Sequence, residues 1–314
     1  MNSYRIVFMG TPEFAVPALK ALIEGPNQVV AVVTQPDRPR GRGRKLMPHQ
    51  IKVLAQKAGI AVLQPEKARS PEFLNQVRDL APDLLVVAAY GRILPQELLD
   101  IPRIMPINVH GSLLPKYRGA APIQWAIIQG DTETGITIME MDAGMDTGPM
   151  LLQEALTIGP EETFDELYER MARLGAKLLV QVLEELYRGT LKPRHQPEEG
   201  ISYALPIKPE MARLDWSQPA TRISCMVRAL DPRPGAYTIW NGQRLRLYMP
   251  FVVEMDASDM EPGTVCRVGE GWVMIATGKG CLCIRELQWP GKRRMPCAEF
   301  LRGRAIPVGA RFES

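Results

Sequence analysis

Residues 4–12 read Tyr4-Arg5-Ile6-Val7-Phe8-Met9-Gly10-Thr11-Pro12. The run that ends at Met9 is short and mostly apolar, and turn residues follow it at once, which is typical of a fully buried β-strand. Thr11 suits the N-cap of a helix and Pro12 suits its first position, so we expect a helix from there to about Glu24. A buried strand that leads into a helix through a glycine turn is the opening unit of a βαβ fold.

The same alternation of apolar runs and helical patterns continues through the first half of the chain. We expect helices at residues 51–58 and 121–129, and further strands at residues 29–34, 84–89, 104–110, 136–141 and 150–156. Strands that alternate with helices predict a parallel sheet with helices on both faces. The predicted fold class is therefore α/β, with a Rossmann-like parallel sheet whose site lies at the carboxyl ends of its strands.

A long helix and a second domain are predicted after this sheet. Thr163 and Glu166 form a capping box that begins the helix, and Gly189 ends it. Residues 190–205 are predicted to be a linker, because they carry prolines and show no clear periodicity. Residues 206–314 hold short alternating runs separated by turn signals such as Asn241-Gly242, which predicts a small OB-like β-barrel. The expected domains are residues 1–189, the linker 190–205 and the barrel 206–314.

Composition and charge restrict the classes of function. The 314-residue chain has a formal net charge of +3, but residues 206–314 hold 16 Lys and Arg against 11 Asp and Glu. A basic C-terminal domain suggests an anionic partner. No apolar run reaches the ~18 residues of a membrane span, and the N-terminus lacks the pattern of a secretion signal. The five cysteines form no CxxC pair and have no histidine at zinc spacing, so we expect a cytoplasmic chain with free thiols and no metal.

The candidate chemistry lies at the end of one apolar strand. Asn108 and His110 are two residues apart, so they point to the same face of a strand, and Gly111 follows them. Either residue alone is common in structural roles, but burying both without partners would cost several kcal/mol. Asp146 lies in a loop with two glycines, Gly144 and Gly148, which allow the backbone to bring a carboxylate inward.

An amide, an imidazole and a carboxylate together suit one kind of reaction. Asn108 and a protonated His110 would donate hydrogen bonds to an oxygen that becomes negative, and Asp146 would orient the imidazole and accept a proton. No serine or cysteine nucleophile with a paired base is evident in the sequence. The set therefore predicts direct attack by an external amine on a carbonyl-type carbon.

With these residues the sequence resembles the folate-dependent formyltransferase family. The resemblance implies that Asn108, His110 and Asp146 are the catalytic residues, that no metal takes part, and that 10-formyltetrahydrofolate is the formyl donor. It also implies that further residues bind the folate: Tyr90, Gly91, Arg92, Ile93, Leu94, Ser112, Leu113, Leu114, Pro115 and Asp142.

Other stretches are similar to the branch of that family that formylates methionyl-tRNA, among them Phe8 to Phe14, Thr34 to Pro39 and Tyr117 to Gln124. This branch implies that the partner is initiator methionyl-tRNA. A basic loop between a strand and a helix would contact its phosphates, with Arg42 aligned to the key arginine of the family. The predicted tRNA contacts are Arg38, Arg40, Arg42, Arg44 and Lys45 in the loop and Lys292, Arg293 and Arg294 in the barrel.

Several alternatives stay open at this point. The same core would formylate a small amine, such as a ribonucleotide or an amino sugar nucleotide, or would hydrolyse formyl-folate. The basic loop and the barrel argue against a small-ribonucleotide enzyme. The stretch from Gly10 to Ala15 lacks the G-x-G-x-x-G pattern of a dinucleotide-binding loop. This absence disfavours a dinucleotide-dependent oxidoreductase. A non-catalytic RNA-binding or folate-sensing protein is disfavoured by the intact catalytic residues. We expect the chain to be a monomer.

Overall fold

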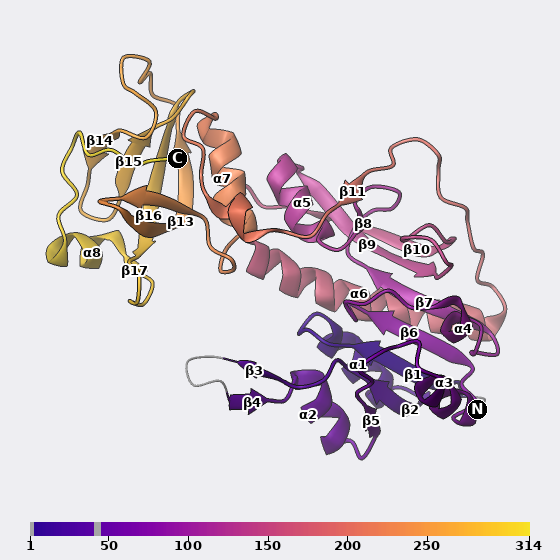
Figure 1. The fold of residues 1–314 in the computed structure, drawn as a ribbon. Coiled ribbons are helices and arrows are strands. Elements are labelled where there is room, and N and C mark those ends of the chain that lie inside the picture. The colour runs from indigo at the N-terminus through magenta and orange to yellow at the C-terminus, as the bar shows by residue number, and fades with distance from the viewer. Residues whose placement is uncertain (1–2, 41–44) are drawn as a thin grey trace. The chain divides into compact units, whose positions relative to one another are not determined.

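A computed structural model describes residues 3–40 and 45–314 (Figure 1). The chain divides into two compact units. The first comprises residues 1–122, 134–156 and 168–205, and the second comprises residues 123–133, 157–167 and 206–314. The first unit therefore includes the whole predicted linker, 190–205. The domain ranges expected from the sequence stay predictions.

The first unit is built on a seven-stranded sheet of order β10-β9-β7-β6-β1-β2-β5. The five neighbouring strands β7, β6, β1, β2 and β5 run parallel to one another, as the alternating sequence pattern predicts. The strand β9 runs antiparallel to β7, so the sheet is mixed at this edge. The bounds are β1 (Arg5–Gly10), β2 (Gln28–Val33), β5 (Ala61–Leu63), β6 (Leu84–Ala88), β7 (Met105–His110), β9 (Glu133–Glu140) and β10 (Met150–Thr157).

Both faces of this sheet are buried. Val7 and Met9 of β1 join a core cluster with Phe73 and Val77, whereas Ile6 and Phe8 point to the opposite face and are equally inaccessible. A strand that is buried on both faces needs apolar residues at every position, which explains the unbroken apolar run of β1. The helices of this part of the chain are α1 (Ala15–Glu24), α2 (Gln50–Lys57), α3 (Pro71–Asp79), α4 (Gln96–Leu99), α5 (Pro122–Gln129) and α6 (Phe164–Arg188).

The first helix begins later than the sequence predicts. Thr11 is not its N-cap, because residues 12–14 form a turn and α1 begins at Ala15. The Thr11 hydroxyl instead donates to the Tyr90 carbonyl and accepts from the Gln35 amide, at 3.4 and 3.3 Å. The later start also explains Pro17, which lies in the first turn of α1, where a helix needs no backbone N–H donor.

The capping box at the start of α6 is confirmed. The Glu166 carboxylate accepts from the Thr163 backbone amide at 2.8 Å and from its hydroxyl at 2.7 Å, and the Glu166 amide donates to the Thr163 hydroxyl at 3.5 Å. These hydrogen bonds hold the pKa of Glu166 below its ordinary value of 4.5. The apolar stripe of the helix is buried, as its spacing predicts; it includes Leu167, Met171, Leu174, Leu178 and Val182.

Two short pairings complete the first unit. β8 (Arg118–Gly119) pairs in parallel with β11 (Tyr203–Ala204), so part of the predicted linker is a strand. β3 (Arg38–Arg40) and β4 (Lys45–Met47) pair antiparallel on either side of residues 41–44.

The second unit holds a curled antiparallel sheet of order β12-β13-β16-β15-β14, with β17 also paired to β16. The chain end bridges both edges of this path: Glu313 pairs with Ile239 of β12, and Arg311 pairs with Thr264 beside β14. The predicted small C-terminal barrel is therefore confirmed, and its tail closes it. The remaining elements are β12 (Tyr237–Trp240), β13 (Gln243–Val253), β14 (Val265–Val268), β15 (Val273–Ala276), β16 (Cys281–Gln288), β17 (Met295–Pro296), the 3-10 helix η1 (Pro209–Ala212), α7 (Ala220–Ala229) and α8 (Cys297–Gly303).

The capping box gives a stability prediction. Replacing Glu166 with Ala should lower the free energy of unfolding by about 1 kcal/mol at neutral pH. Because the folded-state pKa of Glu166 is lowered, its contribution is present above pH 4.5 and is lost as the pH falls through that lowered value. Urea titrations should therefore show the gap between wild type and Glu166→Ala closing in acid. Glu169→Ala, whose carboxylate meets Arg173 on the exposed surface, is the control and should cost about 0.5 kcal/mol or less. A gap that stays constant into acid would contradict the assignment.

Candidate functional site

Asn108 and His110 stand at the carboxyl end of β7 and both reach Asp146. Asn108 Nδ2 donates to Asp146 Oδ1 at 3.3 Å, and His110 Nδ1 lies 3.6 Å from Asp146 Oδ2. The three side chains predicted from the sequence are thus brought together. The alternation of β7 places the first two on one face, and the loop between β9 and β10 supplies the carboxylate.

Asp146 adopts a conformation that is unusual for its residue type. Its φ is +52°, in the left-handed region, which Asp tolerates better than most side chains. Its Oδ2 accepts a hydrogen bond from the Gly119 amide at 2.8 Å. Next in the loop, Gly148 lies so close to strand β9 that an added Cβ would meet the Glu140 carbonyl oxygen at 2.0 Å. The loop is therefore packed tightly against the strand that it leaves.

Both ring nitrogens of His110 face acceptors. Nε2 lies 3.1 Å from the Tyr117 carbonyl oxygen, and Nδ1 faces the Asp146 carboxylate. A neutral imidazole has only one N–H, whereas the protonated ring donates from both nitrogens and satisfies both partners. The ring is 5% exposed, so these partners rather than water define its surroundings.

The segment predicted to bind folate is held in place by its own hydrogen bonds. Ser112 Oγ donates to the Lys116 carbonyl at 2.6 Å, and the Leu114 amide donates to Thr137 Oγ1 at 3.1 Å. Thr137 Oγ1 in turn donates to the Ser112 carbonyl at 2.7 Å. Residues 112–115 end in a cis peptide bond between Leu114 and Pro115. This stretch forms a rigid wall directly after His110.

The second predicted folate segment divides between the core and the surface. The Tyr90 side chain is 1% exposed in the cluster around Phe73, and burial raises the pKa of its phenol. Its hydroxyl has no hydrogen-bond partner among the described residues. Ile93, by contrast, is 89% exposed, so only part of this segment can offer side chains to a ligand.

Asp142, the remaining predicted folate residue, accepts from the Gly144 amide at 3.0 Å and from Thr147 Oγ1 at 2.7 Å. It therefore shapes the loop that carries Asp146. Met145 of the same loop is 57% exposed. Ile93 belongs to a segment predicted to bind folate, and Met145 lies in the same loop as the predicted Asp142; such exposed apolar side chains are the kind of surface that ligands cover.

The predicted tRNA contacts are described only in part. Arg42 and Arg44 lie outside the described residues, and Arg38, Arg40 and Lys45 are described as backbone strands of β3 and β4. The base of this loop is anchored, because Asp37 accepts from Lys52 Nζ at 2.5 Å and from Gln64 Nε2 at 3.1 Å. The Lys52 contact is the main cause of the lowered pKa of Asp37.

The three predicted basic residues of the barrel differ in their surroundings. Lys292 is exposed, and Arg293 is an exposed side chain that contacts Glu299 at 2.6 Å. Arg294 instead lies between Asp231 at 2.6 Å and Glu286, with its guanidinium 4.2 Å from the centre of the Tyr248 ring. Burial raises the pKa of Asp231, and the Arg294 contact acts against that shift. This cluster indicates a structural role for Arg294, and its assignment to tRNA stays a prediction.

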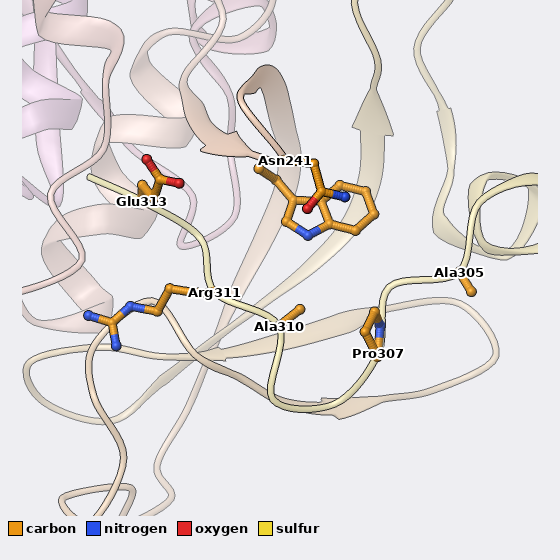
Figure 2. Close-up of a pocket in the computed structure, with 7 residues that line it drawn as sticks. Asn241, Ala305, Pro307, Ala310, Arg311 and Glu313 are labelled. Atoms are coloured by element: carbon orange, nitrogen blue, oxygen red, sulfur yellow. The ribbon is translucent and has the colours of Figure 1, made fainter.

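An open pocket of about 420 Å³ lies in the second unit. Figure 2 shows it between the Asn241 turn and the C-terminal tail. It is lined by Trp240, Asn241, Ala305, Pro307, Ala310, Arg311 and Glu313. None of the predicted catalytic or folate residues belongs to it.

Sequence reasoning missed several residues that hold the site. Gly119 donates to Asp146, Ser202 Oγ accepts from the Tyr117 amide at 2.9 Å, and Gln196 contacts the backbone of the Asp146 loop. The last two lie in the predicted linker, where no periodic pattern marks a contact. Among the described residues no cluster of His, Cys, Asp or Glu could hold a metal ion, and none of the described helices is long and apolar enough to cross a membrane.

Comparison with protein families gives two matches. Residues 4–183 match the family described as "Formyl transferase", and residues 206–305 match "Formyl transferase, C-terminal domain". Two similar proteins are the methionyl-tRNA formyltransferases of Desulfotalea psychrophila and Geobacter sulfurreducens. The first is 50% identical and the alignment covers 97% of this chain and 94% of that protein. The second is 49% identical with coverages of 99% and 98%.

Solved structures share the fold at low identity. WlaRD, a sugar 3N-formyl transferase, has a TM-score of 0.68 at 18% identity, covering 93% of this chain and 100% of that one. HypX from Aquifex aeolicus in complex with tetrahydrofolic acid has a TM-score of 0.64 at 20% identity, covering 96% of this chain and 47% of that one.

The Arg294 cluster gives a prediction that separates structure from binding. Replacing Arg294 with Ala should lower the free energy of unfolding by about 3 kcal/mol, because Asp231 is buried and would lose its cation. Arg293→Ala is the matched control, and its effect should stay within about 0.5 kcal/mol. Thermal or urea unfolding monitored by tryptophan fluorescence measures both. Equal stability of the two variants would show that the cluster does not stabilise the fold.

Proposed function

The chain belongs to the formyl transferase family, and we propose that it moves the formyl group of 10-formyltetrahydrofolate to the amino group of methionine on initiator methionyl-tRNA. The product is N-formylmethionyl-tRNA for translation initiation. The observation that carries this proposal is the convergence of Asn108 and His110 on Asp146. The near-full-length similarity to methionyl-tRNA formyltransferases supports the choice of acceptor.

The geometry supports the following chemistry. The methionine amine attacks the formyl carbon, and the carbonyl oxygen becomes an oxyanion that accepts hydrogen bonds from Asn108 Nδ2 and from the protonated His110, whose Nε2 would exchange the Tyr117 carbonyl for the oxyanion. The attacking nitrogen loses a proton to Asp146, directly or through water. The bond between the formyl carbon and N10 of the folate then breaks, and N10 takes up a proton. The formyl group is thus transferred without a covalent enzyme intermediate.

We propose that the donor folate lies against residues 112–115 and against the segments that carry Ile93 and Met145. The internal hydrogen bonds of the first segment would keep its surface in a fixed position against the folate. The two exposed apolar side chains would be covered by the pterin. Asp142 contributes by shaping the loop, since its carboxylate caps the Gly144 turn. Tyr90 contributes through its backbone, because its ring is buried in the core.

For the acceptor, the basic loop would contact phosphates of the tRNA, and the exposed Lys292 and Arg293 would add electrostatic attraction. Asp37, which accepts from Lys52 and Gln64, holds the chain in place directly before β3. A smaller amine acceptor and formyl-folate hydrolysis are the competing reactions. Sugar formyltransferases share the fold at 18% identity, which carries no evidence about the substrate of this chain.

We further propose a cytoplasmic, monomeric protein. All five cysteines are free, which suits a reducing compartment. Sedimentation of the purified chain tests the monomer.

The catalytic assignment predicts a loss of rate without a loss of binding. His110→Ala should lower turnover by about 10² to 10³-fold, because one donor to the oxyanion is removed. The affinity for tRNA should stay unchanged, since His110 is buried and offers almost no surface to a tRNA. His195→Ala, an exposed linker histidine, is the matched control and should keep full activity. A His110→Ala variant that turns over normally is incompatible with the assignment.

The acceptor is tested by comparing substrates. We expect rapid formylation of initiator methionyl-tRNA, slow formylation of elongator methionyl-tRNA, and little formyl release from 10-formyltetrahydrofolate alone. Single-turnover assays with labelled formyl donor measure all three. Formyl release at equal rates with and without tRNA would identify a hydrolase instead. Transfer to amino sugar nucleotides but not to tRNA would identify a small-amine enzyme.

A further inference from the structure

Gln196 lies in the predicted linker, yet its side chain reaches the loop that carries Asp146. Its amide nitrogen donates to the backbone carbonyls of Asp146 and Gly148, both at 2.8 Å. These two carbonyls lie on either side of Thr147, so one side chain spans the turn. The contact with Asp146 crosses 50 residues of sequence and joins the predicted linker to the backbone of the residue that carries the candidate catalytic carboxylate.

The oxygen of the Gln196 side-chain amide also has hydrogen-bond partners. Its oxygen accepts from Arg118 Nε at 3.1 Å and from Nη2 at 2.7 Å, and Arg118 is only 7% exposed. This pattern fixes the orientation of the amide. If the amide were flipped, its oxygen would face two carbonyls and its NH₂ group would face a guanidinium, so both ends would be repulsive. Gln196 is therefore fully hydrogen-bonded in one arrangement.

The segment around Arg118 connects the predicted linker to Gly119, which contacts the Asp146 carboxylate. The Arg118 amide donates to the Ser202 carbonyl at 2.9 Å, and the Ala120 amide donates to the Ala204 carbonyl at 2.8 Å. Between these two hydrogen bonds stands Gly119, whose amide donates to Asp146 Oδ2. An added Cβ at Gly119 would meet the Ala204 carbonyl oxygen at 2.8 Å, so the linker strand leaves no room for a side chain there.

We propose that Gln196 is a positioning residue, which holds Asp146 in its left-handed conformation and thereby aims its carboxylate at Asn108 and His110. This inference rests on the proposed formyl transfer for its kinetic consequences. It makes Gln196 part of the active site, although this residue lies outside the β-sheet that carries Asn108 and His110. A misplacement of about 1 Å in such a group is enough to cost about 10²-fold in rate.

The experiment compares two replacements of Gln196 in the full-length chain. Gln196→Met keeps the length of the side chain and removes every hydrogen bond, and Gln196→Glu keeps an acceptor for Arg118 but places a carboxylate against two carbonyls. Both should lower the maximal rate by about 10- to 100-fold while KM for tRNA and for formyl-folate stays within about threefold. Glu198→Ala, an exposed residue two positions along the linker, should behave as wild type.

A double mutant separates positioning from general stabilisation. If Gln196 acts through Asp146, Gln196→Met should cost less than about twofold in an Asp146→Asn background, because the group that it positions no longer carries the function. An equal loss in both backgrounds overturns the proposal, as does a normal rate for Gln196→Met alone.

Amide hydrogen exchange provides a readout that does not depend on activity. Gln196→Met should speed exchange at the Gly119 amide and in peptides spanning residues 142–149, with exchange in β1 unchanged. Unchanged exchange at Gly119 and in that loop overturns the proposal. If the wild-type chain fails to formylate methionyl-tRNA, the proposed function is rejected, and the exchange result then decides by itself whether Gln196 holds the loop.

Discussion

The Asp146 carboxylate accepts hydrogen bonds from the Asn108 side chain and the Gly119 amide, and it lies 3.6 Å from His110 Nδ1. Three residues from two separate segments, the strand β7 and the stretch around Gly119, depend on this one group for their mutual arrangement. Because an ionised carboxylate is an acceptor only, the groups around it have to be donors, and this requirement selects an amide side chain, a backbone N–H and an imidazole N–H. A change in the direction of this carboxylate therefore alters all three contacts together.

The direction of β9 makes it difficult to bring the Asp146 carboxylate to Asn108 and His110. Because β9 runs antiparallel to β7, its end at Glu140 lies beside Ile107, and the Met141 amide donates to the Pro106 carbonyl at 2.9 Å. The chain has therefore already passed His110 when β9 ends. Residues 141–149 have to fold back along β7 to return a carboxylate to Asn108 and His110. A tight loop with a left-handed Asp146 and a glycine packed on β9 is the physical result.

Whether a feature can be predicted from the sequence depends on how far apart its interacting residues are along the chain. Asn108 and His110 are found because the period of a strand is local, and the capping box of α6 is found because it spans one helical turn. The start of α1 is misplaced because Thr11 satisfies Tyr90 and Gln35 rather than the helix, a contact that no local rule contains. Gln196 and the tail residues that close the barrel are missed for the same reason. Their partners are 47 or more residues away, the shortest separation being that between Thr264 and Arg311, and neither segment has a periodic pattern.

The predicted linker shows why residues that sequence analysis misses are concentrated in segments without a periodic sequence pattern. The backbone groups of a residue inside a helix are paired within that helix, and those inside a strand are paired with neighbouring strands, so such a residue adds mainly its side chain to a site. Residues 196–204 lie outside the main sheet, and they use side chains and backbone alike: Gln196 and Ser202 contribute amide and hydroxyl groups, and the carbonyls of Ser202 and Ala204 pair with the segment around Gly119. A segment without regular structure can place its backbone and side-chain donors and acceptors opposite those of an irregular loop. The backbone groups of a regular element are already paired and cannot do this. This stretch therefore makes specific contacts around Asp146 and Gly119, which a mere connection between domains would not require.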